Sequence, residues 1–362
     1  MIDIDMRLIY FLIILFVFFL YNSTIIHNRN HLRILEPVIL NRIVILILCH
    51  DKVTDFQNML SSLFKVRGVP SRVDIIVSQS GLHKEVYDIA ISYGLTVIQH
   101  EDHDTSTEHR LANHFRWSFE KVFEMYPDSN GLIVLEDDFL FSPDFLEYFE
   151  LTIPLLDVDP TLFTVSAWND NGFKQNTHDL HNIKRVSFFP GLGWYLSRKT
   201  WNNELASIWP TSDWDWVIRK YVETNKLEII IPEISRDYHA ASSGTYMKKD
   251  LFYRYFKNIR MNTDNDFRWN NDDILSLDYM SYKDNIIKEL NDNVKNKVIF
   301  ATKQQLKSAS FSNNYEMWHA IERGAWNGIR IIWDTKDKQY VYIIDSFSNP
   351  EWNNYRLPSV TL

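Results

Sequence analysis

The sequence predicts an α/β fold: a mainly parallel sheet with helices on both faces. Between residues 42 and 234, apolar runs of strand length alternate with stretches of helical period. These runs are apolar almost throughout, which is typical of strands buried on both faces of a sheet. Sheets of this kind bind ligands at the carboxyl ends of their strands.

The individual elements follow from the same two periods. Each predicted strand is a short run rich in branched apolar residues, and each helix between the first four strands carries apolar residues every three or four positions. The predicted strands are 42–48, 73–78, 95–99, 131–135, 161–167 and 228–234, and the helices are 54–64, 84–94 and about 108–126.

The next helix is expected just after the fourth strand. Ser142 is a suitable cap and Pro143 suits the first helical turn. We assign the residues from Phe139 onward to this helix and expect them to lie outside the chemistry of the site.

The pattern changes after about residue 265. Two alternating strands surround a turn at 335–338, which predicts a hairpin. We therefore expect a small C-terminal domain with a β-hairpin over 276–362.

Composition narrows the function classes. The formal net charge of -9 argues against nucleic acid, whose binders display basic patches. The single cysteine, Cys49, allows no internal disulfide, and beside the first strand it is expected to be buried packing. Aromatic residues make up 15% of the chain, which fits either a tryptophan-rich core or a platform for a sugar or base.

The N-terminus predicts a membrane anchor. No residue from Leu8 to Ile26 is charged, and a bilayer-spanning helix needs about 20 apolar residues. A cleaved signal peptide is the alternative, but no small-residue cleavage site follows. We assign 1–27 to a cytosolic tip and anchor and 28–38 to a short stem, although the flanking charges leave the orientation open.

Three adjacent carboxylates, Glu136, Asp137 and Asp138, follow the fourth predicted strand directly. Burying such a triplet is costly unless a partner neutralises it. A divalent cation with oxygen ligands would do so, and a solvated turn is the alternative. Since no glycine-rich phosphate loop is present, a bound nucleotide would need this cation to neutralise its phosphates.

A second cluster alternates acids with indoles, Asp213-Trp214-Asp215-Trp216. A carboxylate among aromatic rings can serve as a general base. The alternative is a helix N-terminus with Ser212 or Asp213 as cap and the tryptophans in the core.

Other features carry weaker signals. Gly191 and Gly193 indicate positive φ or a close backbone approach. The sequence HEDHD at 100–104 fits no standard zinc spacing, so we expect a polar loop. Asp272 and Asp273 are expected in solvated loop.

Taken in order, five segments resemble the glycosyltransferases related to N-acetylglucosaminyltransferase I. They are VLEDDFLFSPDFLEYF, SAWNDNG, FFPGLGW, WPTSDWDWVIR and IIIPEISR, within a stretch from about Val38 to Asn262. The resemblance implies a GT-A nucleotide-sugar-binding fold over 39–241, followed by a closing loop and linker at 242–275. It also implies UDP-GlcNAc as donor, Mn²⁺ as cofactor, and a single-pass type II Golgi membrane protein with a lumenal catalytic domain.

The resemblance also implies roles for individual residues. Asp138 corresponds to the metal ligand, and Asp215 corresponds to the catalytic base. The residues expected on the donor side are Lys52, Ser80, His114, Glu136, Asp137 and Ser242, and those expected to line the acceptor cleft are Trp214, Gly191 and Trp194.

The chain departs from the family pattern at several of these positions. Lys52 stands where the family has arginine, after the matching Asp51, and lysine lacks the bidentate fork. Ser80 replaces an aspartate that contacts uracil, and Trp216 replaces the second of two acids. The loop between Arg236 and Gly244 is also shorter.

The implied activity is inverting transfer of GlcNAc from UDP-GlcNAc to the 2-OH of a terminal mannose on an N-glycan, forming a β-1,2 linkage. Three alternatives stay open. The acceptor could be O-linked mannose of a protein, the donor could be another UDP-sugar, or the chain could be a catalytically silent glycan-binding relative.

Overall fold

The computed structural model describes residues 43–101, 103–292, 295–308, 311, 315–320, 322–345 and 352. They belong to one compact unit, Asn41–Leu362. The predicted anchor and stem lie outside the described residues, and no described helix has the length and apolar character needed to cross a membrane. The domain boundaries after residues 241 and 275 stay predictions.

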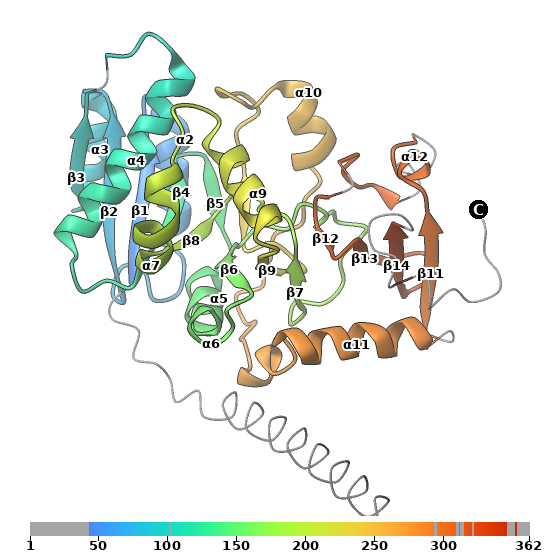
Figure 1. The fold of residues 1–362 in the computed structure, drawn as a ribbon. Coiled ribbons are helices and arrows are strands. Elements are labelled where there is room, and N and C mark those ends of the chain that lie inside the picture. The colour runs from blue at the N-terminus through green and yellow to red at the C-terminus, as the bar shows by residue number, and fades with distance from the viewer. Residues whose placement is uncertain are drawn as a thin grey trace, which may run out of the picture. The chain divides into compact units, whose positions relative to one another are not determined.

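A five-stranded sheet forms one side of this unit (Figure 1). Its strand order is β3-β2-β1-β4-β8, and the first four predicted strands run parallel, as expected. The added edge strand β8 is antiparallel to β4. The strands are β1 (Ile43–Cys49), β2 (Val73–Ser80), β3 (Thr96–His100), β4 (Gly131–Glu136) and β8 (Trp194–Ser197).

The predicted helices connect these strands, as α2 (Val53–Leu63), α3 (Lys84–Ser92) and α4 (Thr107–Met125). The chain steps from β1 to β2 to β3 in one direction and then returns to β4 beside β1. Right-handed crossovers therefore place α2 and α3 on one face and α4 on the other, and α4 lies in front of the sheet in Figure 1.

The core explains much of the aromatic content. Phe115 and Phe119 of α4 pack against apolar strand residues and against a group of buried indoles. That group comprises Trp194, Trp201, Trp209 and Trp214, each no more than 8% exposed. Trp216, by contrast, is 61% exposed.

The last two predicted strands form a separate sheet. β6 (Leu162–Val165) and β9 (Glu228–Pro232) are parallel, and β7 (Ile183–Val186) pairs antiparallel with β9. An isolated bridge between Ser166 and Trp194 links this sheet to β8. The helix α9 (Trp214–Thr224) precedes β9, so the acid–indole cluster begins a helix.

The predicted helix start after β4 is wrong. Phe139–Phe141 is a strand, β5, paired antiparallel with β10 (Asp237–His239), and α5 (Phe145–Thr152) begins three residues after Ser142. Asp144 precedes α5 without capping it, because its carboxylate accepts hydrogen bonds from Arg236 Nε at 2.7 Å and Asn262 Nδ2 at 2.8 Å. Ser142, the expected cap, instead continues the pairing with β10, because its N–H donates to Arg236 O at 2.9 Å.

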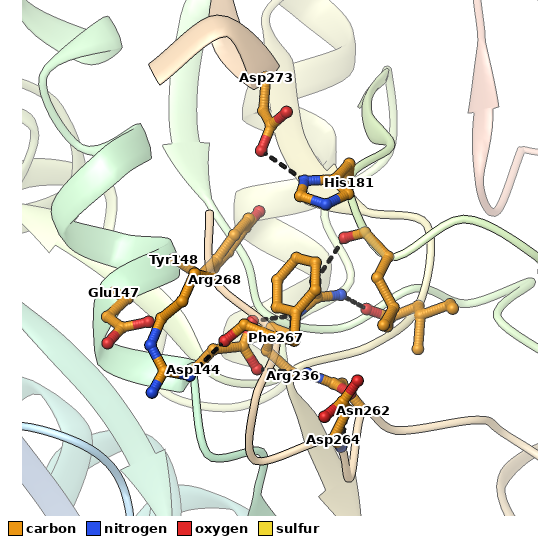
Figure 2. A network of polar contacts seen from close by, with 12 residues as sticks. Asp144, Glu147, Tyr148, His181, Arg236, Asn262, Asp264, Phe267, Arg268 and Asp273 are labelled. Carbon is orange, nitrogen blue, oxygen red and sulfur yellow. Dashed lines mark hydrogen bonds and ion pairs between the residues drawn. The ribbon is translucent and has the colours of Figure 1, made fainter. Parts of the chain in front are cut away.

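Figure 2 shows this buried network. The side chains of Arg236 and Asp144 are both 0% exposed, and the Arg236 guanidinium lies 4.4 Å from the centre of the Trp269 ring. Asp273 bonds His181 at 2.8 Å and the Asn270 backbone N–H at 2.8 Å, so assigning it to a solvated loop is wrong. The network fixes the chain just before β10.

The predicted hairpin is confirmed as β13 (Ile329–Asp334) and β14 (Gln339–Asp345). It belongs to a four-stranded sheet of order β11-β14-β13-β12, with β11 (Asn296–Ala301) and β12 (Ala325–Trp326) at its edges. Trp333 N donates to Asn176 O at 2.9 Å, which joins this sheet to the rest of the unit. The remaining elements are α6 (Leu155–Val158), α7 (Arg198–Thr200), η1 (Trp201–Leu205), α8 (Ala206–Ile208), α10 (Lys249–Leu251), η2 (Phe252–Phe256), η3 (Asn271–Ile274), α11 (Tyr279–Asn291) and α12 (Lys303–Leu306).

Candidate active site

A cavity of about 480 Å³ lies at the carboxyl ends of β1, β2 and β4, where ligand sites of parallel sheets are expected. The start of α9, the segment 244–247 and the chain near Trp318 complete its walls. This volume falls within the range of small-molecule sites. The cavity brings together nine residues singled out from the sequence: Lys52, Ser80, His114, Glu136, Asp137, Asp138, Gly191, Trp214 and Asp215.

The acidic triplet forms one wall of the cavity. Glu136 ends β4, and the turn before β5 carries Asp137 and Asp138, which are 7% and 6% exposed. Burial, followed by repulsion from the neighbouring acids, raises the pKa of Glu136 to about 8 and the pKa of Asp137 to about 7. The triplet therefore carries the electrostatic cost that its sequence suggests.

Lys52 lies against this wall. Its Nζ is 2.7 Å from Asp138 Oδ2 and 3.8 Å from Asp137 Oδ1. Burial opposes the ammonium charge, but the two carboxylates outweigh it and raise the pKa of Lys52. Lys52 therefore stays protonated, and its charge is available to a phosphate group entering the cavity.

His239 is a cavity residue that the sequence analysis missed. It ends β10, and its Nε2 lies 3.6 Å from Asp138 Oδ1. Burial lowers the pKa of His239, which favours the neutral imidazole. No spacing in the sequence predicts that His239 lies near Asp138, because the two residues are brought together only by the pairing of β5 with β10.

The wall fits a divalent cation, although among the described residues no three His, Cys, Asp or Glu side chains form a metal-binding group. Asp138 Oδ1 is buried and has no hydrogen-bond partner in the described chain. Hard cations bind carboxylate oxygens, and they commonly take one or two protein ligands together with substrate phosphates and water.

Asp215, the second residue of α9, lines the same cavity as the triplet. Arg219 lies one helical turn later, and its Nη1 is 2.5 Å from Asp215 Oδ2. Arg219 also donates from Nε to Phe189 O at 3.1 Å, so it holds the carboxylate at a fixed place. The spacing of four residues on a helix is a signal that could have identified Arg219 from the sequence.

Two of the residues expected on the donor side, Ser80 and His114, also line the cavity. Ser80 ends β2, and its carbonyl accepts a hydrogen bond of 2.7 Å from His50 Nδ1. His114 is 2% exposed, and its Nε2 lies 2.9 Å from Ser78 Oγ. Cys49, at the end of β1, is buried as expected.

Two of the named residues do not line the cavity. Trp194 is 1% exposed and lies in the core, although it stacks 6.3 Å from Trp214, which does line the cavity. Ser242 is half-buried beside the cavity, whose wall is formed by the next residues along, from Gly244 to Met247.

The C-terminal part of the chain also contributes to the cavity. Arg323 lies 4.1 Å from the Trp318 ring centre, and its Nη1 is 3.1 Å from Asp170 Oδ1. Both Arg323 and Trp318 line the cavity. Neither residue could be identified from the sequence, because the family resemblance fades before this region.

Two solved structures show some similarity to this chain. Residues 1–349 of S. aureus TarS in complex with UDP-GlcNAc give a TM-score of 0.41 at 11% identity, over 57% of this chain and 60% of that one. The mannosyltransferase PcManGT from Pyrobaculum calidifontis, in complex with GDP-Man and Mn²⁺, gives a TM-score of 0.36 at 11% identity. The match covers 55% of this chain and 59% of that one.

Sequence comparisons are more specific. A relative from Arabidopsis thaliana, described as alpha-1,3-mannosyl-glycoprotein 2-beta-N-acetylglucosaminyltransferase, is 35% identical over 204 residues. The alignment covers 54% of this chain and 45% of the relative, so the chain spans less than half of that protein's length. The model of the GNT-I family matches residues 23–319, which cover most of the chain. The resemblance inferred from the motifs is thereby confirmed, and the chain belongs to the GNT-I family.

Proposed function

We propose that the chain transfers GlcNAc from UDP-GlcNAc to the 2-OH of a terminal mannose on an N-glycan, with inversion and formation of a β-1,2 linkage. The observation that carries this proposal is the cavity that the acidic triplet and Asp215 both line. Membership of the GNT-I family supports the choice of donor and acceptor, and the name of the plant relative agrees with it.

The proposed cofactor is Mn²⁺, with Asp138 as a protein ligand. When bound, a divalent cation acts as a Lewis acid that neutralises charge developing on the diphosphate leaving group. Lys52 adds a second positive charge at the same wall, because its ammonium group already lies 2.7 Å from Asp138 Oδ2.

Asp215 is the proposed general base, which removes the proton from the acceptor hydroxyl as that oxygen attacks the anomeric carbon. Arg219 orients the carboxylate through the 2.5 Å contact. A base positioned in this way contributes about 10²–10⁴ in rate. Gly244, Thr245, Tyr246 and Met247 line the cavity from a loop, and closure of this loop over the donor would exclude water and limit hydrolysis.

The proposed location is the Golgi membrane, as a single-pass type II protein whose catalytic part is lumenal. The uncharged run from Leu8 to Ile26 supports an anchor, and the family supports the compartment.

A substrate panel tests the proposed function. We expect the purified full chain, given Mn²⁺, to transfer sugar from UDP-GlcNAc to a mannose-terminated N-glycan, and to stop when the cation is chelated. UDP-GalNAc, UDP-Gal and UDP-Glc serve as competing donors because they keep the uridine diphosphate and change only the sugar. An O-mannosyl peptide serves as the competing acceptor.

Each result of the panel has a definite reading. Preference for the O-mannosyl peptide overturns the proposed acceptor, and preference for another UDP-sugar overturns the donor. No transfer from any donor overturns the enzymatic function and favours a silent glycan-binding relative.

A further inference from the structure

The short sheet of β5 and β10 places a histidine beside the acidic triplet. In its register His239 pairs with Phe139, the residue directly after Asp138. Just beyond, Ala240 N donates to Asp138 O at 2.9 Å. The backbone ladder therefore fixes the spacing between the side chains of His239 and Asp138.

The separation between these side chains is informative. His239 Nε2 and Asp138 Oδ1 lie 3.6 Å apart, which is longer than a normal N–H···O hydrogen bond. Two ligands of one cation, with bonds of about 2.1 Å and an angle of about 90–120° between them, lie about 3.0–3.6 Å apart. The pair is therefore spaced as neighbouring ligands and not as hydrogen-bond partners.

The two carboxylate oxygens of Asp138 differ in their hydrogen bonding. Oδ2 accepts a hydrogen bond from Lys52 at 2.7 Å. Oδ1, which faces His239, is buried with no hydrogen-bond partner among the described residues. A buried carboxylate oxygen left without a partner is costly, and the open cavity beside it is where a ligand can remove that cost.

His239 is held in position from both ends of β10. Its ring lies 5.7 Å from that of Phe139 and 5.4 Å from that of Phe256. Three residues earlier, Arg236 is anchored to Asp144 in the network of Figure 2. A side chain fixed in this way can hold a metal without reorganisation.

We propose that His239 is the second protein ligand of the divalent cation, alongside Asp138; this inference rests on the proposed function. Two protein ligands leave the remaining positions to diphosphate oxygens and water, which agrees with the lack of a three-residue metal group among the described residues. An imidazole ligand also shifts selectivity from Mg²⁺ towards transition metals such as Mn²⁺ and Co²⁺.

Pulsed electron paramagnetic resonance of Mn²⁺ tests this ligand without any turnover. The full chain is loaded with MnCl₂ and UDP, and nuclear modulation from imidazole nitrogen is recorded. We expect a ¹⁴N modulation that changes to ¹⁵N when the protein is labelled with ¹⁵N-histidine. This isotope comparison uses only the wild-type protein, so it stays informative even if a variant fails to fold.

A matched pair of variants assigns the signal. His239→Phe keeps an aromatic ring between Phe139 and Phe256, so we expect loss of the histidine modulation and at least about a tenfold weaker Mn²⁺ affinity in the presence of UDP. His178→Phe removes a histidine whose ring also packs against an aromatic ring, that of Trp333, but outside the cavity and outside the network of Figure 2, and should keep both readouts.

The outcomes separate the inference from the proposed function. Mn²⁺ binding with no histidine modulation, or with a modulation that survives in His239→Phe, overturns the role of His239 and leaves the proposed function standing. In the latter case His50 or His114, which also line the cavity, would be the source. No Mn²⁺ binding by the wild-type chain, even with UDP, overturns the proposed cofactor as well.

Discussion

At the scale of single residues, the site is governed by carboxylates that the fold keeps close together. The triplet ends a buried strand, and the nearest positive charge is Lys52, which bonds Asp138 and approaches Asp137. Glu136 makes no ion pair with it, and burial raises the pKa of Glu136 to about 8. The site thus concentrates negative charge that a bound cation would offset.

This charge has a consequence for stability. The folded pKa values of Glu136 and Asp137, about 8 and about 7, lie above their ordinary values of 4.5 and 3.8. The folded state therefore binds more protons than the unfolded state between these limits, and stability falls as pH rises. We expect the free energy of unfolding of the metal-free chain to decrease from about pH 5 to about pH 8.

Urea denaturation at several pH values measures this slope. Glu136→Gln keeps the shape of the protonated side chain, so it should flatten the decrease, while Glu85→Gln at an exposed position of α3 should leave it unchanged. An unchanged slope in Glu136→Gln would show that Glu136 does not titrate as described.

At the scale of elements, close approaches between segments decide where the site residues lie. β8 begins after Gly193, whose φ is 44°. Because Gly193 has no side chain, the carboxyl group of Asp237 in β10 fits beside it. A Cβ on Gly193 would lie 1.9 Å from Asp237 Oδ2. The fold therefore requires glycine here for two reasons, its backbone angle and the space beside it.

Replacing Gly193 by alanine should destabilise the chain by more than the strain of its positive φ alone, because the new Cβ would also clash with Asp237. Gly94 is the matched control, because it also has positive φ, 72°, but nothing lies within 4 Å of an added Cβ. We expect Gly94→Ala to cost about 1–2 kcal/mol, and Gly193→Ala to cost a further ~1–3 kcal/mol from overpacking. Chemical denaturation measures both, and equal losses would mean that Asp237 moves aside freely.

At the scale of the whole molecule, the sequence predicted the parallel sheet and nine of the residues that line the cavity. The first four strands and their helices follow from apolar periodicity, which burial on both faces of a sheet imposes. The triplet and Asp215 were found because each directly adjoins a strongly patterned element, β4 or α9.

The parts that the sequence missed depend on long-range pairing. His239 reaches Asp138 only because β5, a strand of three residues, pairs with β10 nearly a hundred residues later. Arg323 and Trp318 reach the cavity from the C-terminal part of the chain. The helix start after β4 was misplaced because the chain up to Ser142 pairs with β10 and its neighbour Arg236.

One paired measurement decides whether this cavity transfers GlcNAc by means of Asp215. Product formation from UDP-GlcNAc and a mannose-terminated N-glycan is followed by NMR for the wild-type chain and for Asp215→Asn, with UDP affinity measured alongside. We predict a β-linked product from the wild-type chain, loss of transfer by at least about 10² in the variant, and nearly unchanged UDP binding. An α-linked product, or full transfer by Asp215→Asn, would contradict the account.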